Sequence, residues 1–362
     1  MARLAVSPIQ FALDVAAVFP AQTLAYPEFR YMGSKHRLLP WIHAVLSELS
    51  FETVADPFSG SGCVSYLLKA MGKKVVSSDF LNFPTVIASA LVSNQSERVS
   101  RDLAEQLARP GRPQYRFIRE TFSGIFFNPD DLVFLDLIWE RIDELPEGRE
   151  RDLVLTALLR SAMKRQPRGV FTVGNLADGK QRYDDGRRDV RLSMREHFLE
   201  QIEVMNRVVF DGPRCFAERR DALQPPVSPV DLVYLDPPYV PRSDDNCYVK
   251  RYHFLEGLSN YWRGMELLPG SKVKKLVKPA TPFSHRRSSI DAFEQLFRAY
   301  GDSTIVLSYS SNGFPDLNVL VGLMRQVKKR VEVDTRAHRY HFGTHRAVQR
   351  SETTEYLIVG TS

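Results

Sequence analysis

Four consecutive residues could carry chemistry: Asp236, Pro237, Pro238 and Tyr239. They follow an apolar run at 232–235, which predicts a buried strand that stops at an acid. Prolines lack an N–H and stiffen the backbone, so the carbonyls and the aspartate carboxylate remain free to accept hydrogen bonds. The tyrosine offers a flat face for stacking. A base with an exocyclic amino group, adenine or cytosine, fits these features.

Acceptors in this arrangement favour attack by an amine nitrogen. Two acceptors would hold the amino hydrogens and bring the nitrogen lone pair out of conjugation with the ring. The nitrogen could then attack a methyl group in line, and it would lose its proton only after the methyl arrives. Catalysis would consist of orientation and charge placement, without a strong base. The structural alternative is a strand-end turn in which the prolines stop the ladder.

A second group of residues, DPFSGSG, contains Asp56, Phe58, Gly60 and Gly62 and precedes an expected helix. Glycines let the backbone approach a ligand, and the first turn of a helix offers free N–H groups. Asp79 ends the next apolar segment, 23 positions after Asp56. An acid at that point commonly holds ribose hydroxyls, so a nucleoside-bearing cofactor is expected.

The glycine loop favours S-adenosylmethionine over NAD. The stretch from Gly60 to Ser65 lacks the third glycine of a dinucleotide fingerprint, and Asp56 precedes it. An acid is unfavourable beside a phosphate but favourable beside the ammonium group of a methionine moiety. A structural glycine turn is the alternative, since glycine motifs alone are weak evidence. The presence of DPPY in the same chain makes that alternative the less favoured one.

Alternating strand and helix patterns predict a doubly wound α/β sheet that positions both motifs. A strand into DPFSGSG, a helix over 63–72 and a strand over 73–82 form its first unit. Ligands bind outside the carboxyl ends of such strands, so DPPY should face the same crevice as the glycine loop. A further strand is expected at 303–313, and 330–342 with 354–360 should form a closing antiparallel pair.

The length and composition are those of an ordinary globular chain of 362 residues. Its net charge of +6 permits nucleic-acid binding without requiring it. Its three cysteines, Cys63, Cys215 and Cys247, lack zinc-site spacing and fit a reducing compartment. No apolar stretch of about 18 residues occurs, and the N-terminus lacks the order of a signal peptide. We therefore expect a soluble cytoplasmic protein without membrane contact.

The motif order resembles that of the Dam-type, alpha-group N6-adenine-specific DNA methyltransferases. Residues 29–42 (FRYMGSKHRLLPWI) are similar to their N-terminal motif, DPFSGSG to the cofactor loop and LDPPY to the catalytic motif. Residues 308–313 and 338–360 resemble the closing segments, and the resemblance covers most of 29–95 and 215–360. It implies an S-adenosylmethionine-dependent, Rossmann-like mixed sheet that methylates the N6 amino group of adenine in duplex DNA, in a restriction-modification or epigenetic role.

The resemblance also implies roles for single residues. Tyr31 and Lys35 would touch the cofactor, and Tyr31 stands where tryptophan is common in the family. Asp221 would lie near the cofactor adenine, and Asp236 near both the cofactor and the target amino group. The expected cofactor-binding residues are Tyr31, Lys35, Asp56, Phe58, Gly60, Gly62, Asp79, Asp221 and Asp236.

A base inside a duplex cannot reach Asp236, so base flipping is expected, with Tyr239 stacked on the extruded base. Basic residues at 161–195, 271–287 and 333–346 could form the cradle for the duplex, mostly through phosphate contacts. The expected DNA-binding residues are Lys164, Arg165, Arg168, Lys180, Arg182, Arg187, Arg188, Arg286 and Arg287.

The resemblance divides the chain into parts and suggests partners. We expect an N-terminal extension at 1–25, a catalytic domain at 26–100 and 208–362, and a mostly helical target-recognition insertion at 101–207. The expected partners are double-stranded DNA and a cognate restriction endonuclease. The expected location is the bacterial cytoplasm, in association with the nucleoid.

Three alternatives compete with adenine methylation. N4-cytosine methyltransferases more often carry serine in place of Asp236. The second alternative is methylation of an amino group in RNA or of a protein glutamine. Enzymes that methylate glutamine usually have asparagine in place of Asp236. A catalytically dead DNA-binding protein is the third, against which the intact DPPY argues. A metal is not expected, because His341 and His345 lie four apart in strand and loop, where that spacing does not share a face.

Overall fold

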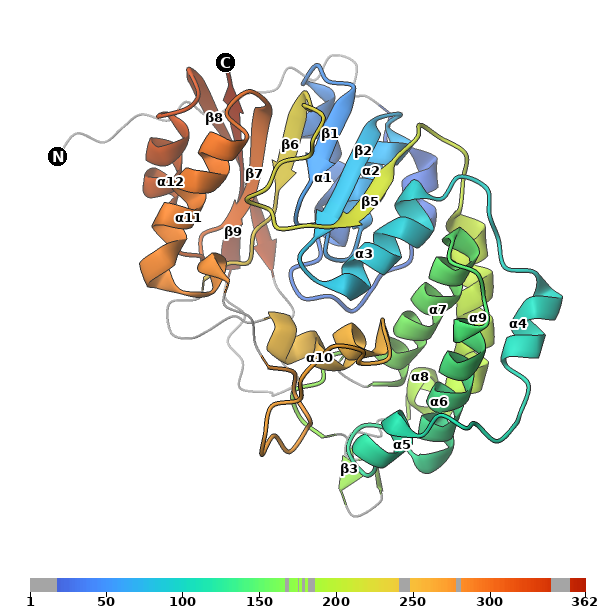
Figure 1. Cartoon of the computed structure of the whole chain (residues 1–362). Helices are drawn as coiled ribbons and strands as arrows, with labels where there is room; N and C mark the ends of the chain where they lie inside the picture. The colour runs from blue at the N-terminus through green and yellow to red at the C-terminus, as the bar shows by residue number, and fades with distance from the viewer. Residues whose placement is uncertain are drawn as a thin grey trace.

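A seven-stranded mixed sheet forms the centre of the computed structural model, in the order β5-β2-β1-β6-β7-β9-β8 (Figure 1). Within the described part of the chain, no helix is long and apolar enough to cross a membrane. The structure describes residues 18–166, 169–174, 176–177, 180–181, 186–240, 248–277, 281–339 and 352–362.

The strands of the sheet fall into a parallel and an antiparallel part. Strands β5, β2, β1, β6 and β7 are parallel, and β9 pairs antiparallel with both β7 and β8, which confirms the expected closing pair. A separate antiparallel pair joins β3 to β4. The bounds are β1 (Thr53–Asp56), β2 (Lys74–Asp79), β3 (Leu176–Ala177), β4 (Lys180–Gln181), β5 (Phe216–Arg219), β6 (Leu232–Leu235), β7 (Thr304–Ser310), β8 (Arg330–Arg339) and β9 (Glu352–Thr361).

Helices α4 to α9 lie in sequence between β2 and β5 and gather beyond the β5 edge of the sheet (Figure 1). The α-helices are α1 (Leu39–Ser47), α2 (Cys63–Ala70), α3 (Asn82–Ala88), α4 (Arg101–Leu107), α5 (Phe117–Thr121), α6 (Pro129–Asp143), α7 (Arg149–Arg165), α8 (Arg188–Arg191), α9 (Met194–Val208), α10 (Tyr248–Leu258), α11 (Arg286–Ala299) and α12 (Leu317–Met324). The shorter helical turns are η1 (Ala21–Ala25), η2 (His36–Leu38), η3 (Ser89–Ser93) and η4 (Pro282–Ser284).

Both faces of the sheet are covered by hydrophobic cores. Side chains alternate along a strand, so Val54 joins the core that contains α1, α2 and α3, whereas its neighbour Ala55 joins the core that contains α11 and α12. Every residue of β6 is buried, as expected for a central parallel strand covered on both sides. The expected doubly wound arrangement of strands and helices is confirmed.

Three acids meet at one edge of the sheet. Strands β1 and β2 end at Asp56 and Asp79, and β6 leads directly into Asp236. These strands are parallel neighbours, with Ala55 opposite Val76 on one side and Val233 on the other. Their carboxyl ends therefore point the same way, as the sequence predicts.

Two buried charged side chains join segments that surround the sheet. Glu256 of α10 accepts hydrogen bonds from the backbone N–H groups of Asn82 and Phe83, the first residues of α3, where a negative charge complements the helix dipole. Lys69 donates to the carbonyls of Asn94 and Phe210 at 2.6 and 2.9 Å. It thereby joins the points where the chain leaves the sheet for α4 and returns from α9.

The glycines, prolines and many basic residues of 161–195 predict a surface excursion, and this prediction is wrong for the first part of the segment. Helix α7 continues to Arg165, and Ser161, Ala162 and Met163 are buried. The reason is tertiary. Helix α7 packs against α9, and the charged residues of its last turn find partners on α6 and α8, Arg165 with Asp131 and Lys164 with Asp189.

Candidate active site

A cleft at the carboxyl edge of the sheet collects residues from both motifs. Of the expected cofactor residues, only Gly62 is not part of its wall. Gly62 immediately precedes α2 with φ 75°, and a Cβ there would lie 2.7 Å from the Tyr26 hydroxyl. The expected residues that line the cleft are Tyr31, Lys35, Asp56, Phe58, Gly60, Asp79, Asp221, Asp236, Pro237, Pro238 and Tyr239.

Asp236 is paired with Lys35 inside this cleft. The Lys35 Nζ lies 2.8 Å from Asp236 Oδ1, and the lysine side chain is 2% exposed. The same ammonium donates to the carbonyl of Gly33 at 3.0 Å and lies 5.0 Å from the centre of the Tyr239 ring. Burial raises the pKa of Asp236, and the lysine charge opposes that rise. The lysine thus favours the ionised carboxylate.

Tyr239 lies between two carboxylates. Its hydroxyl is 3.4 Å from Asp236 Oδ1 and 3.3 Å from Oε2 of Glu355, a fully buried residue of β9. A phenol has one proton to donate, so one carboxylate at a time receives it. The ring packs edge-on against Tyr309 at 4.7 Å. The second carboxylate is absent from the sequence analysis, because a lone glutamate in a strand carries no motif.

Asp56 has one satisfied and one unsatisfied oxygen. Oδ2 accepts from the Ser65 hydroxyl at 2.6 Å, while the buried Oδ1 has no hydrogen-bond partner among the described residues. Burial raises the pKa of Asp56 to about 7, although the Ser65 bond works against the rise. A buried acceptor without a donor is costly, so a cationic or N–H-bearing ligand would stabilise it.

Asp79 braces the glycine loop. Its Oδ2 accepts from the Gly60 N–H at 3.0 Å, and Oδ1 accepts from the Leu81 N–H at 2.9 Å. Burial raises its pKa to about 6. Each carboxylate oxygen keeps a further lone pair, so the group can accept from ligand hydroxyls while it holds the loop.

The comparisons with known proteins point to one family. The model of the D12 class N6 adenine-specific DNA methyltransferase family matches residues 31–305, most of the chain. The chain belongs to this family. This adenine methyltransferase is 26% identical to the type II methyltransferase M2.HphI of Haemophilus parahaemolyticus. The two align over 333 residues, which are 87% of the chain and 92% of that protein. It is 26% identical over 337 residues to the modification methylase LlaI of Lactococcus lactis subsp. lactis, covering 86% of the chain and 51% of LlaI.

Two tyrosines of α10 also belong to the cleft of the methyltransferase or to its support. Tyr248 lines the cleft and donates to the carbonyl of Met32 at 3.2 Å. Tyr252 stacks on Tyr31 with ring centres 5.0 Å apart and an angle of 2°. Sequence reasoning missed both residues. Their spacing of four positions along a helix was the available signal, but it is equally typical of a core face.

The basic residues expected to contact DNA differ in their exposure. Arg187, Arg188, Arg286 and Arg287 are exposed, and Lys164 is partly buried beside Asp189. Arg165 is a correction to the expectation of surface residues: it is 5% exposed, and its Nε lies 2.8 Å from Asp131. The side chains outside the described residues are those of Arg168, Lys180 and Arg182, and also of His341 and His345.

Proposed function

We propose that this protein transfers a methyl group from S-adenosylmethionine to the N6 amino group of an adenine flipped out of duplex DNA. One observation carries the proposal: the DPPY carboxylate, Asp236, shares a cleft with Asp56, a buried acid that has an unsatisfied oxygen. The first can orient an amino group, and the second can bind a cation. Family membership favours adenine over the cytosine alternative.

The residues of the cleft fit S-adenosylmethionine. The free oxygen of Asp56 would receive the ammonium group, and Asp79 would accept from ribose hydroxyls. Gly60, at φ 49°, keeps the loop close to Tyr31; a Cβ there would lie 2.9 Å from the tyrosine ring. When bound, this cofactor supplies an activated methyl group on a sulfonium.

Asp236 would accept a hydrogen bond from the target amino group, and the carbonyls of the two prolines are further acceptors without competing N–H groups. Lys35 favours the ionised form of the carboxylate, and Tyr239 would stack on the base. Glu355 can accept the hydrogen bond of the tyrosine hydroxyl, so this hydroxyl need not occupy Asp236 when the amine binds there. These residues contribute orientation and charge placement.

The exposed arginines of the segments 161–195 and 271–287 would bind the phosphates of the duplex. Their loss should therefore weaken DNA binding to a similar degree for every DNA sequence. Residues 101–207 would form the target-recognition insertion, and 26–100 with 208–362 the catalytic domain. We also propose a restriction-modification role with a cognate endonuclease, because the curated relatives are a type II methyltransferase and a modification methylase by name.

Methyl transfer from labelled S-adenosylmethionine to plasmid DNA, followed by digestion to nucleosides, tests the proposal. The expected labelled product is N6-methyl-2′-deoxyadenosine. Sequencing of methylated adenines in the same DNA would give the recognised site. Label in N4-methylcytosine, or label in RNA or protein and none in DNA, would overturn the proposal.

A further inference from the structure

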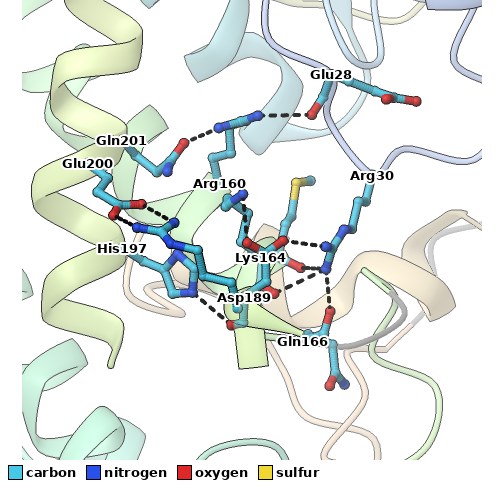
Figure 2. Close-up of polar contacts among 11 residues, drawn as sticks. Glu28, Arg30, Arg160, Lys164, Gln166, Asp189, His197, Glu200 and Gln201 are labelled. Atoms are coloured by element: carbon cyan, nitrogen blue, oxygen red, sulfur yellow. Dashed lines mark hydrogen bonds and ion pairs between the residues drawn. The ribbon is translucent and has the colours of Figure 1, made fainter. Parts of the chain in front are cut away.

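Arg30 joins the segment that carries Tyr31 to the end of helix α7 (Figure 2). Its Nη1 atom donates to the carbonyl oxygens of Met163, Lys164 and Gln166 at 3.2, 3.1 and 3.1 Å. The last carbonyls of a helix lack partners within the helix, and a cation there complements the helix dipole. Arg30 therefore caps α7 from a distant part of the chain.

The same guanidinium binds Asp189 of α8, as Figure 2 shows. Arg30 Nη2 lies 2.6 Å from Oδ2 of Asp189, and Lys164 Nζ lies 3.0 Å from Oδ1. The backbone carbonyl of Asp189 accepts from Nε2 of the buried His197 on α9 at 2.8 Å. Through this one aspartate, Arg30 is connected to α8 and α9 as well as to α7.

The chain also passes against Arg30 just after α7. Gly169 has φ 68°, and a Cβ there would lie 2.5 Å from the Cβ of Arg30, so a larger residue would displace the segment. Two residues further on, the Phe171 N–H donates to the carbonyl of Arg251 at 2.9 Å, and the Phe171 carbonyl accepts from His253 at 2.7 Å. The segment that leaves α7 is thus held between Arg30 and α10.

Arg30 is also connected to exposed basic residues through Asp189. Arg187 and Arg188, two exposed arginines of the proposed DNA-contact set, immediately precede this aspartate in the chain. On its other side Arg30 is bonded to Tyr31, which lines the cleft and stacks on Tyr252. A single side chain therefore connects the start of α8, where Arg187 and Arg188 lie, to the segment that forms a wall of the cofactor cleft.

We propose that Arg30 is a positioning residue that couples DNA contact by Arg187 and Arg188 to the geometry of the cofactor cleft. The inference rests on the proposed function. DNA bound to these two arginines would bear on the adjacent Asp189, and Arg30 would transmit the shift to Tyr31. Such coupling is reciprocal, so the duplex and the cofactor tighten each other's binding by the same factor.

Calorimetry with S-adenosylmethionine, with and without a duplex that carries the mapped site, tests the coupling. For the unaltered protein the duplex should tighten cofactor binding about five-fold or more. Arg30→Ala should bring this factor close to one and should raise the KM for DNA more than it lowers kcat. Arg101→Ala is the matched control, because it removes an exposed arginine paired with Glu105 on α4 and should keep the full factor.

Gly169→Ala disturbs the contact between Gly169 and Arg30 without a change of charge, and it replaces Arg30→Ala as the test if that variant does not fold. Gly169→Ala should also bring the factor by which the duplex tightens cofactor binding close to one. A purely structural role would lower the unfolding temperature and leave the coupling factor unchanged, which would overturn the inference. Absence of coupling in the unaltered protein would overturn it as well. If the unaltered protein methylates no DNA, the proposed function falls and this inference falls with it.

Discussion

Lys35 and Asp236 form an ion pair in the cleft, with Nζ and Oδ1 2.8 Å apart. Lys35 comes from the segment that precedes α1, and Asp236 from the end of β6. The lysine side chain is almost completely buried and the aspartate side chain is 18% exposed, so neither charge is well hydrated. Each depends on the other, and this dependence can be measured.

Replacement of Lys35 by methionine should lower the free energy of unfolding by about 3–5 kcal/mol, because it leaves a buried carboxylate without its counter-charge. The double variant Lys35→Met, Asp236→Asn should recover part of that loss, since an amide needs no counter-charge. Chemical denaturation measures all three proteins, with Lys74→Met as an exposed control expected to lie within about 0.5 kcal/mol of the unaltered protein. Unchanged stability of Lys35→Met would contradict the role of the pair.

Asp236→Ala should reduce turnover by about 100-fold or more, because it removes the group that orients the target amine. Duplex binding should survive, since most of the affinity for DNA comes from phosphate contacts elsewhere. Single-turnover methylation and a gel-shift titration of the same preparation give the two quantities. Loss of binding together with normal turnover per bound complex would sink the assignment.

Cofactor binding should weaken as the pH falls below about 7. The pKa of Asp56 is raised by burial to about 7, so the empty cleft holds a neutral acid at lower pH, and a cationic ligand must expel that proton. Affinity should then fall by up to about tenfold per pH unit. Calorimetry from pH 5.5 to 8 measures this slope. The Asp56→Asn variant should bind the cofactor weakly at every pH and should show no such slope.

The same carboxyl affects folding in the absence of cofactor. Its pKa in the folded state exceeds its unfolded value, so it contributes stability below about pH 4 that is lost as the pH rises through about 7. Asp56→Asn should therefore flatten the decline of the unfolding temperature between these values. An identical decline in both proteins would assign it to other groups.

Glu355 and Tyr239 should act as a unit. If Glu355 accepts the hydrogen bond of the Tyr239 hydroxyl, Glu355→Leu, which removes the acceptor, should lower kcat. The same change should matter less in a Tyr239→Phe background. The expected coupling in such a double-mutant cycle is about 0.5–3 kcal/mol. Strictly additive effects on kcat would mean that Glu355 acts on Asp236 without the tyrosine hydroxyl.

Gly60→Ala should weaken cofactor binding, whereas Gly72→Ala should not. Both glycines have positive φ, so either substitution costs about 1–2 kcal/mol of stability. Only at Gly60 would the added Cβ meet a side chain of the cleft, the ring of Tyr31; nothing lies within 4 Å at Gly72. Equal affinities in the two variants would remove the argument for close approach at the loop.

Local sequence patterns were sufficient to predict the strands of the sheet other than β5, and the acids that end or directly follow three of them. Apolar runs that stop at Asp56, Asp79 and Asp236 place these acids at one edge, because parallel strands align their carboxyl ends. The closing antiparallel pair was equally visible from its residues. The glycine loop and the DPPY motif signalled a cofactor and an amine without knowledge of distances.

Contacts between distant segments decided the rest. Arg165 looks like a surface cation in the sequence, but the packing of α7 buries it against Asp131. Glu355 looks like an ordinary strand residue, but β9 beside β7 brings its carboxylate to Tyr239. The sequence by itself determined which residues end the strands, because periodicity and proline chemistry act locally. Only the tertiary structure decided which charges are paired, since burial and proximity arise when the sheet order brings remote segments together.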